Sequence, residues 1–337
     1  MASDRQVDGD RAWPCDDDDI PTFVTALGLP GLIDIHTHFM PDAVLAKVWA
    51  YFDRLHDPSG RPQWPIHYRT DETERLAILR GLGVRRFTSM FYAHKPGMAA
   101  WLNDWGVAFA ADQQDVVHSA TFFPEPGVDA YVAEAIEAGA RVFKAHLQVG
   151  AFDPREPSLA PVWRRLADAG IPVVVHAGSG PEPGPYTGPE PMTDVLDAHP
   201  ELTAVIAHMG APEYAAFLEL ALRHPNVHLD TTMAFTDFME VLAPFPDKLL
   251  GTLGDHPDRI VLGTDFPNTP YPYAHQLASL TGLGLGHDWL RAVCWDNGAR
   301  LIGPPPADTD PGSGPRPDPR PVPSADVPRD GARSEKP

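Results

Sequence analysis

The segment Gly-Leu-Ile-Asp-Ile-His-Thr-His, residues 31–38, is an apolar run typical of a β-strand that ends in two histidines one residue apart. Side chains at positions i and i+2 of a strand lie on the same face, so His36 and His38 can reach one point beyond the strand's end. Neutral imidazole is a common ligand of first-row divalent metals. The segment therefore predicts a buried strand that carries part of a metal site. The alternative is a polar strand end whose histidines bind nothing.

Similar apolar strands recur through residues 21–302, where they alternate with helical stretches. This alternation is typical of βα units around a parallel sheet. Strands are predicted at residues 32–38, 86–92, 116–123, 141–147, 173–176, 204–208, 227–230 and 260–264, and helices at 71–82, 129–138, 161–169, 212–223 and 289–301. Eight such units predict a (β/α)8 TIM barrel, and a doubly wound open sheet is the alternative.

Two terminal segments and one insertion lie outside the repeating pattern. Residues 1–20 carry an acidic run and few apolar side chains, and residues 303–337 are rich in proline. Such segments bury too little apolar surface to offset their ordering entropy, so both are predicted to be disordered tails without chemistry. Residues 39–70 form an insertion whose aromatic side chains either cover the barrel mouth or simply pack: Trp49, Tyr51, Phe52 and Trp64.

Composition limits the partners. The formal net charge of -20 leaves no surplus of Lys and Arg to neutralise nucleic-acid phosphates or an anionic membrane. Cys15 and Cys294 form neither a disulfide framework nor a zinc-knuckle pattern. The chain shows no apolar signal segment and no stretch of membrane-spanning length. We therefore expect a cytoplasmic protein that acts on a small molecule, and the sequence leaves a homodimer open.

Polar residues also end the later predicted strands, where a barrel places its chemistry. The fifth and sixth strands end in His176 and His208, and Asp265 directly follows the eighth. A single histidine at such a position is usually a satisfied polar group, but this set at corresponding positions predicts a metal site. Three imidazoles and a carboxylate suit zinc, iron, manganese or cobalt, and we expect one divalent ion, with zinc as the first choice.

These motifs resemble the amidohydrolase superfamily, and especially its amidohydrolase-related branch, which includes aminocarboxymuconate-semialdehyde decarboxylase. The resemblance spans the whole predicted barrel, through the Asn-Gly-Ala-Arg-Leu segment at residues 297–301. It implies that the metal ligands are His36, His38, His176 and Asp265. It also implies that His208 is an acid/base or carbonyl-polarising residue beside the metal.

The same roles follow from physical chemistry. A bound divalent metal lowers the pKa of its water towards about 7. Asp265 can accept the proton of that water and return it to a leaving group. His208 can hydrogen-bond a substrate oxygen that becomes negative, and its alternative role is to orient another ligand. His208 and Asp265 are therefore the predicted catalytic residues.

Three further residues are candidates for contact with substrate or with a second metal. Lys144 and His146 lie two residues apart on the fourth predicted strand. In some relatives a carbamylated lysine at the end of this strand bridges two metals, whereas a salt bridge or a substrate carboxylate explains Lys144 equally well. Lys95, after the second strand, can meet an anionic substrate or remain a solvated loop residue. We expect one metal rather than two.

The predicted ligands serve two reactions. The first is hydrolysis of an amide, ester or lactone by metal-activated water. The second is non-oxidative decarboxylation of an aromatic or unsaturated carboxylic acid, which a basic residue facing the metal would favour, such as Arg54, Arg69 or Lys95. A third possibility is a barrel that binds metal without catalysis, and the full ligand set argues against it.

Overall fold

Nine short parallel strands form the centre of the fold: β1 Leu32–Asp34, β2 Val84–Thr88, β3 Val116–Val117, β4 Ser119–Thr121, β5 Val142–His146, β6 Val173–His176, β7 Ala204–Ile206, β8 Val227–Asp230 and β9 Ile260–Val261. The structure is a computed structural model, and it describes residues 13–57 and 59–306. Each strand pairs with its neighbour in sequence, in the orders β1-β2-β3 and β4 through β9. β3 and β4 are the two halves of one predicted strand, which is interrupted at His118.

The two sheets meet at two seams, one at His118 between β3 and β4 and the other between β1 and β9. Hydrogen bonds at both seams close the sheets into a barrel. At the first seam, the Arg141 N–H donates to the carbonyl oxygen of His118 at 2.9 Å. At the second, the Ile35 N–H donates to the carbonyl oxygen of Leu262 at 3.0 Å, and Thr37 forms a parallel bridge with Phe266. The predicted TIM barrel is therefore confirmed, and the open sheet is wrong.

The strands are buried on both faces, which explains their nearly continuous apolar runs. In β6, Val174 belongs to the cluster that fills the barrel interior, whereas Val173 and Val175 pack in the larger cluster around it. Ile302, near the end of the described chain, joins the interior cluster. The interior of the barrel is therefore a packed apolar core.

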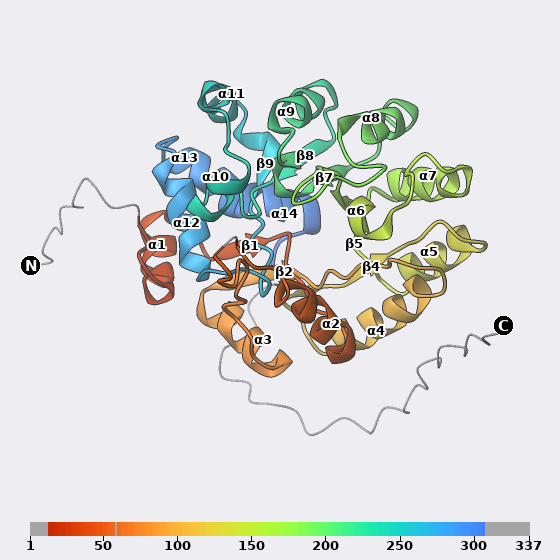
Figure 1. Ribbon diagram of the computed structural model, residues 1–337, viewed down its shortest axis with the longest axis horizontal. Coiled ribbons are helices and arrows are strands. Elements are labelled where there is room, and N and C mark those ends of the chain that lie inside the picture. Colours follow the sequence, from red (N-terminus) through yellow and green to blue (C-terminus); the bar gives the residue numbers. More distant parts are fainter. Residues whose placement is uncertain (1–12, 58, 307–337) are drawn as a thin grey trace, which may run out of the picture. The chain divides into compact units, whose positions relative to one another are not determined.

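Helices surround the strands, as Figure 1 shows. Their bounds are α1 Ile20–Ala26, α2 Asp42–Phe52, α3 Glu72–Gly81, α4 Ala99–Ala111, α5 Val128–Glu137, α6 Leu147–Gly150, α7 Ala160–Ala169, α8 Pro189–Ala198, α9 Tyr214–Arg223, α10 Asp237–Leu242, α11 Leu250–Asp255, α12 Tyr273–Gly282, α13 His287–Arg291 and α14 Asn297–Ile302. Four predicted helices match α3, α5, α7 and α9. The helix predicted at 289–301 is instead α13, a π-helical segment over Ala292–Asp296, and α14. Among the described helices, none has both the length and the apolar character needed to cross a bilayer.

The insertion at residues 39–70 is anchored to the loop after β9. It contains α2 and two tryptophans whose indole N–H groups converge on one residue. Trp49 donates to Oδ1 of Asn268 at 3.1 Å, and Trp64 donates to the carbonyl oxygen of Asn268 at 2.7 Å. The Asn268 N–H in turn donates to the carbonyl oxygen of Asp265 at 2.7 Å. The insertion therefore supports the loop that carries a predicted ligand.

The prediction of a disordered tail at residues 1–20 is wrong for residues 13–20. Pro14 and Ile20 are buried, and the Trp13 ring packs edge-on against Phe23 at 5.3 Å. A 3-10 turn follows at Asp17–Asp19. Composition does not reveal this packing, because Asp17 in the acidic run accepts hydrogen bonds from Tyr68 and Ala274 on the barrel. Residues 1–12 and 307–337 of the predicted tails lie outside the described residues, and residues 303–306 have no regular secondary structure.

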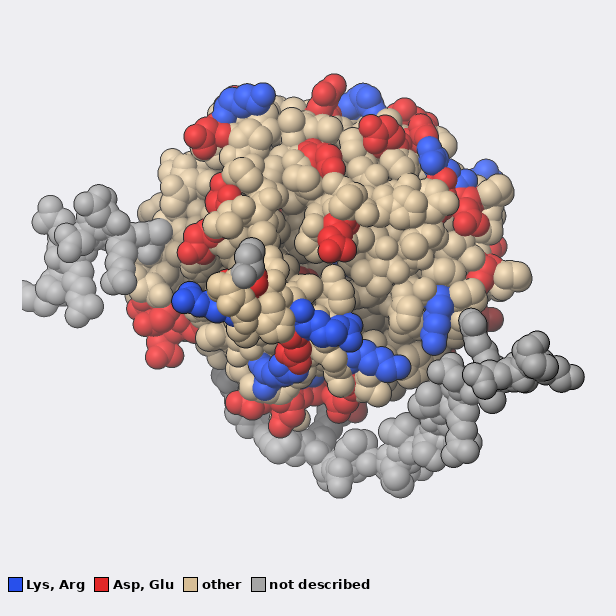
Figure 2. Space-filling view, viewed as in Figure 1, with Lys and Arg blue, Asp and Glu red and all other residues tan. Residues whose placement is uncertain are grey.

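Acidic side chains are distributed over much of the face seen in Figure 2, and Lys and Arg side chains lie in its lower part and also along its upper and right edges. This distribution agrees with the formal net charge of -20. The helix α2 lies in the same lower region of Figure 1.

Candidate metal centre

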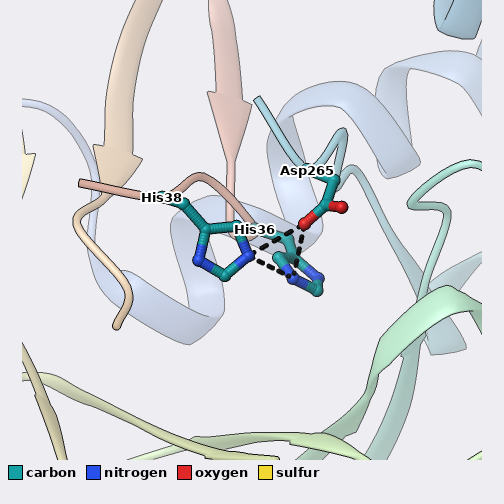
Figure 3. Close-up of side chains that lie close together, drawn as sticks. All are labelled: His36, His38 and Asp265. Atoms are coloured by element: carbon teal, nitrogen blue, oxygen red, sulfur yellow. Dashed lines mark hydrogen bonds and ion pairs between the residues drawn. The ribbon is translucent and has the colours of Figure 1, made fainter. Parts of the chain in front are cut away.

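Three predicted ligands meet where the barrel closes. His36 and His38 follow β1, and Asp265 follows β9. The backbone joins the two segments, because the Asp265 N–H donates to the carbonyl oxygen of His36 at 2.8 Å. Nε2 of His36 lies 3.2 Å from Nε2 of His38. Oδ1 of Asp265 lies 2.8 Å from Nε2 of His38 and 3.4 Å from Nε2 of His36. Figure 3 shows the three buried side chains pointing toward one another.

The hydrogen bonds of the two imidazoles show that these donors fit a cation. Nδ1 of His36 lies 2.8 Å from Oδ2 of Asp230, and Nδ1 of His38 lies 3.0 Å from the carbonyl oxygen of Met90. Each acceptor holds the ring proton on Nδ1, so each Nε2 presents a lone pair. Two lone pairs therefore converge with the oxygen of Asp265. Ligands of one tetrahedral or octahedral ion lie about 2.9–3.4 Å apart, which is close to the observed spacing.

Asp230 is a site residue that the sequence analysis missed. It ends β8 and is completely buried. Besides its contact with His36, its Oδ1 accepts hydrogen bonds from the backbone N–H groups of His208 at 2.9 Å and Thr232 at 3.1 Å. Burial raises the pKa of this carboxyl, and the nearby His208 and Lys144 act against that rise. The signal was present, because Asp230 ends its predicted strand just as His176 ends another.

The two predicted catalytic residues share an unusual backbone conformation. His208 has φ of 55° and Asp265 has φ of 69°, in the left-handed region that non-glycine residues seldom adopt. Such conformations persist where the surrounding structure fixes them, and they are common at functional sites. Burial lowers the pKa of His208 to about 4. Burial raises the pKa of Asp265, but the close contact with Nε2 of His38 and the nearby imidazoles outweigh it and hold the pKa below the usual range.

His176 and His208 lie beside the three-residue cluster. The His208 ring centroid is 5.3 Å from that of His36 and 4.8 Å from that of His176. Nε2 of His176 lies 2.9 Å from the carbonyl oxygen of Gly180, so this nitrogen is engaged by the loop after β6. Burial lowers the pKa of His176 to about 3. The ligand role of His176 stays a prediction.

The remaining candidates divide into two groups. Lys144 is buried, and its Nζ lies 3.2 Å from Nε2 of His36. Burial lowers the pKa of Lys144 to about 8. The His146 ring stacks on that of His176 at 4.0 Å, with an interplanar angle of 10°. By contrast, Lys95 is exposed in the loop after β2, and no hydrogen bond or ion pair joins it to the cluster among the described residues.

The two arginines that would favour decarboxylation if they faced the metal make other contacts. Arg69 forms two hydrogen bonds of 2.7 Å with the carboxylate of Asp53. The Arg54 guanidinium lies 6.0 Å from the ring centroid of Tyr51. Among the described residues, Lys144 is a basic residue whose side chain does contact the cluster, at Nε2 of His36.

Comparisons with known proteins agree with this fold. A family model described as amidohydrolase matches residues 33–303. An uncharacterised TIM-barrel protein from Bordetella bronchiseptica is 20% identical with a TM-score of 0.62, over 81% of this chain and 98% of that chain. A protein described as a probable 2-pyrone-4,6-dicarboxylic acid hydrolase from Acinetobacter baumannii is 14% identical with a TM-score of 0.54, over 81% and 99% of the two chains.

The IDCase of Metarhizium anisopliae is 16% identical with a TM-score of 0.51, over 82% of this chain and 98% of that chain. No curated protein matches the sequence significantly. At these identities the solved structures establish the fold alone.

Proposed function

Because the chain belongs to the amidohydrolase family, we propose that it is a metal-dependent hydrolase that cleaves an amide, ester or lactone bond of a small molecule. The observation that carries this proposal is the convergence of two imidazole lone pairs and one carboxylate oxygen, contributed by His36, His38 and Asp265. Acceptors on the far side of both imidazoles fix the tautomers, as in other metal sites with histidine ligands.

A divalent metal at this position would supply a Lewis acid and a water whose pKa is lowered towards about 7. The ligand types suit zinc, iron, manganese or cobalt, and we propose zinc. His176 is proposed as a further ligand. Since its Nε2 contacts the carbonyl oxygen of Gly180, ligation through that atom requires the ring or the loop to move.

Asp265 is the proposed general base. A pKa below the usual range means that the carboxylate is ionised at neutral pH, the form that can accept a proton from water. The same carboxyl group can then return that proton to the leaving amine or alkoxide. The left-handed backbone at Asp265 and its hydrogen bond to His36 hold the carboxylate in place for both transfers.

His208 is proposed to stabilise the substrate oxygen as it becomes negative. With a pKa of about 4 the imidazole is neutral near pH 7, and it can donate one hydrogen bond. Asp230 fixes the backbone of His208 and the ring of His36 through its two oxygens. One buried carboxylate therefore orients both a ligand and the oxyanion-stabilising residue.

Lys144 gives specific support to a second reaction, non-oxidative decarboxylation. It places a buried ammonium group 3.2 Å from Nε2 of His36, where it can hold a substrate carboxylate. A panel of esters, lactones, amides and aromatic acids distinguishes the two reactions. Hydrolysis predicts release of acid and alcohol or amine without carbon dioxide. Release of carbon dioxide from a carboxylic acid would instead establish the decarboxylase.

A further inference from the structure

The N-terminal acidic segment reaches the metal centre through a chain of hydrogen bonds that is part-buried at Asp17 and buried beyond it. Oδ2 of Asp17 accepts a hydrogen bond from the Tyr68 hydroxyl, and Oδ1 accepts one from the Ala274 N–H at 2.8 Å. The Tyr68 oxygen accepts from the Tyr273 N–H at 2.6 Å. The Tyr273 hydroxyl then donates to Oδ2 of Asp34 at 2.9 Å. The chain therefore joins the acidic run to the segment of the first ligands.

Asp34, at the inner end of this chain, ties together the two segments that carry the ligands. It is completely buried, and its Oδ1 accepts from the His36 N–H at 3.0 Å. Its Oδ2 also accepts from the hydroxyl of Thr264, the neighbour of Asp265, at 2.6 Å. A buried carboxylate is costly unless its oxygens are hydrogen-bonded, and these donors satisfy both. Asp34 therefore bridges β1 and the loop after β9.

A second contact from the same chain reaches Asp265. The Tyr68 ring packs on Phe266, which directly follows Asp265, with the ring centroids 4.7 Å apart. Tyr68 and Tyr273 are both buried, so water competes little with these contacts. Asp17 is thus connected with both sides of the ligand cluster without touching a ligand.

The seam between the two sides needs this support. β1 and β9 belong to different sheets, and among the described residues they share no continuous strand pairing. Their junction consists of a bridge between Thr37 and Phe266 and a few backbone hydrogen bonds. Side-chain contacts therefore help to set the distance between His36 and Asp265.

We infer that Asp17, Tyr273 and Asp34 are positioning residues of the metal centre, which hold the segment after β1 in register with the loop after β9. The inference rests on the metal site of the proposed function. It assigns part of the N-terminal acidic run to the site. Asp17 acts through Tyr68 and Tyr273, and Asp34 acts directly on the backbone of His36.

Two conservative variants test this inference in the full chain. Asp17→Asn replaces one of the two accepting oxygens with an NH2 group, which cannot accept the hydrogen bond that Asp17 receives there. Tyr273→Phe removes the hydroxyl that donates to Asp34. Asp18→Asn is the matched control, because Asp18 is exposed in the same run and its side chain makes no hydrogen bond among the described residues. All three retain nearly the volume of the original side chain.

The first readout is hydrogen exchange of the metal-free proteins over residues 32–38 and 260–266. We expect exchange to be several-fold faster in Asp17→Asn and Tyr273→Phe than in wild type and in Asp18→Asn. The second readout is zinc affinity, measured by competition with a chelator. We expect about a 3- to 10-fold loss, at or below the range for partners that contact a ligand directly. The double variant should lose no more zinc affinity than the weaker-binding single variant, because both substitutions break the same chain of hydrogen bonds.

A lower melting temperature alone does not support the inference. The inference would be overturned if Asp17→Asn and Tyr273→Phe both exchanged at the rate of Asp18→Asn over the two segments and bound zinc with unchanged affinity. Failure of wild type to bind zinc would contradict the proposed function, and the exchange measurement would still decide the role of Asp17. The two failures are therefore distinguishable.

Discussion

At the scale of single residues, hydrogen bonds on the far side of the ligands matter as much as the ligands themselves. His36 and His38 are recognisable in sequence because they end an apolar strand. Their tautomers depend on Asp230 and on the carbonyl oxygen of Met90, which come from other strands or loops. The sequence shows which residue types end each strand, but not which of them contact one another. Asp230 was missed for this reason.

Replacement of Asp265 tests its proposed role as the base. Asp265→Asn removes the ionised oxygen, so we expect turnover to fall at least about 100-fold while the circular dichroism spectrum stays that of the wild type. Asp112→Asn, at an exposed position after α4, is the control and should retain full turnover. Turnover of Asp265→Asn within a few-fold of wild type would exclude Asp265 as the base.

Replacement of Asp230 tests the partner that the sequence did not reveal. Asp230→Asn replaces the acceptor opposite Nδ1 of His36, which frees the imidazole to adopt the other tautomer. We expect zinc affinity to fall about 10- to 100-fold, measured by competition with a chelator. Zinc affinity equal to that of wild type would show that the tautomer of His36 does not depend on Asp230.

At the scale of elements, the sequence predicts the strands better than their connections. All eight strand positions are confirmed, because strands buried on both faces give distinct apolar runs. The break at His118 was not predicted, since it depends on pairing across the barrel. The prediction of one continuous helix at 289–301 was wrong over Ala292–Asp296, because the periodicity of apolar residues does not reveal a π-helical segment.

Gly263, between β9 and Asp265, tests the close packing of the strands that carry the site. An added Cβ would lie 2.4 Å from Oγ1 of Thr232 and 2.8 Å from Cβ of His36. Gly263→Ala should therefore reduce both zinc affinity and stability, the latter by about 1–3 kcal/mol. Gly251→Ala is the control, since a Cβ at this position in α11 meets no atom within 4 Å. Equal urea midpoints for the two variants would contradict the packing argument.

At the scale of the whole molecule, the barrel is predictable and the role of the N-terminal segment is not. The barrel follows from a pattern repeated along residues 21–302. Composition alone made residues 13–20 look like a tail, because an acidic run usually remains solvated. Its burial depends on donors supplied by Tyr68 and Ala274, which are distant in the sequence.

The half-buried His228 predicts part of the response of the whole fold to acid. Burial and the neighbouring Arg259 lower the pKa of His228 to about 4. Below about pH 6.5 the unfolded chain binds a proton at this residue that the folded chain does not bind until about pH 4. The free energy of unfolding should therefore decrease as the pH falls from 6.5 to 4, by roughly 1–3 kcal/mol from this residue.

Urea unfolding of His228→Gln at several pH values measures this contribution. The variant should lose less stability than wild type between pH 6.5 and 4, whereas His287→Gln, at an exposed position on α13, should follow the wild type. An identical pH dependence in all three proteins would contradict the assignment to His228.

The central claim is that the closed barrel builds a metal site from the ends of its first and last strands. The most direct test is the metal content of the protein after dialysis against zinc and removal of free ion, measured by plasma mass spectrometry. The account predicts one zinc ion per chain in wild type and a large loss in the double variant His36→Ala/His38→Ala. A wild-type protein that retains no zinc, or a double variant that retains one equivalent, would contradict it.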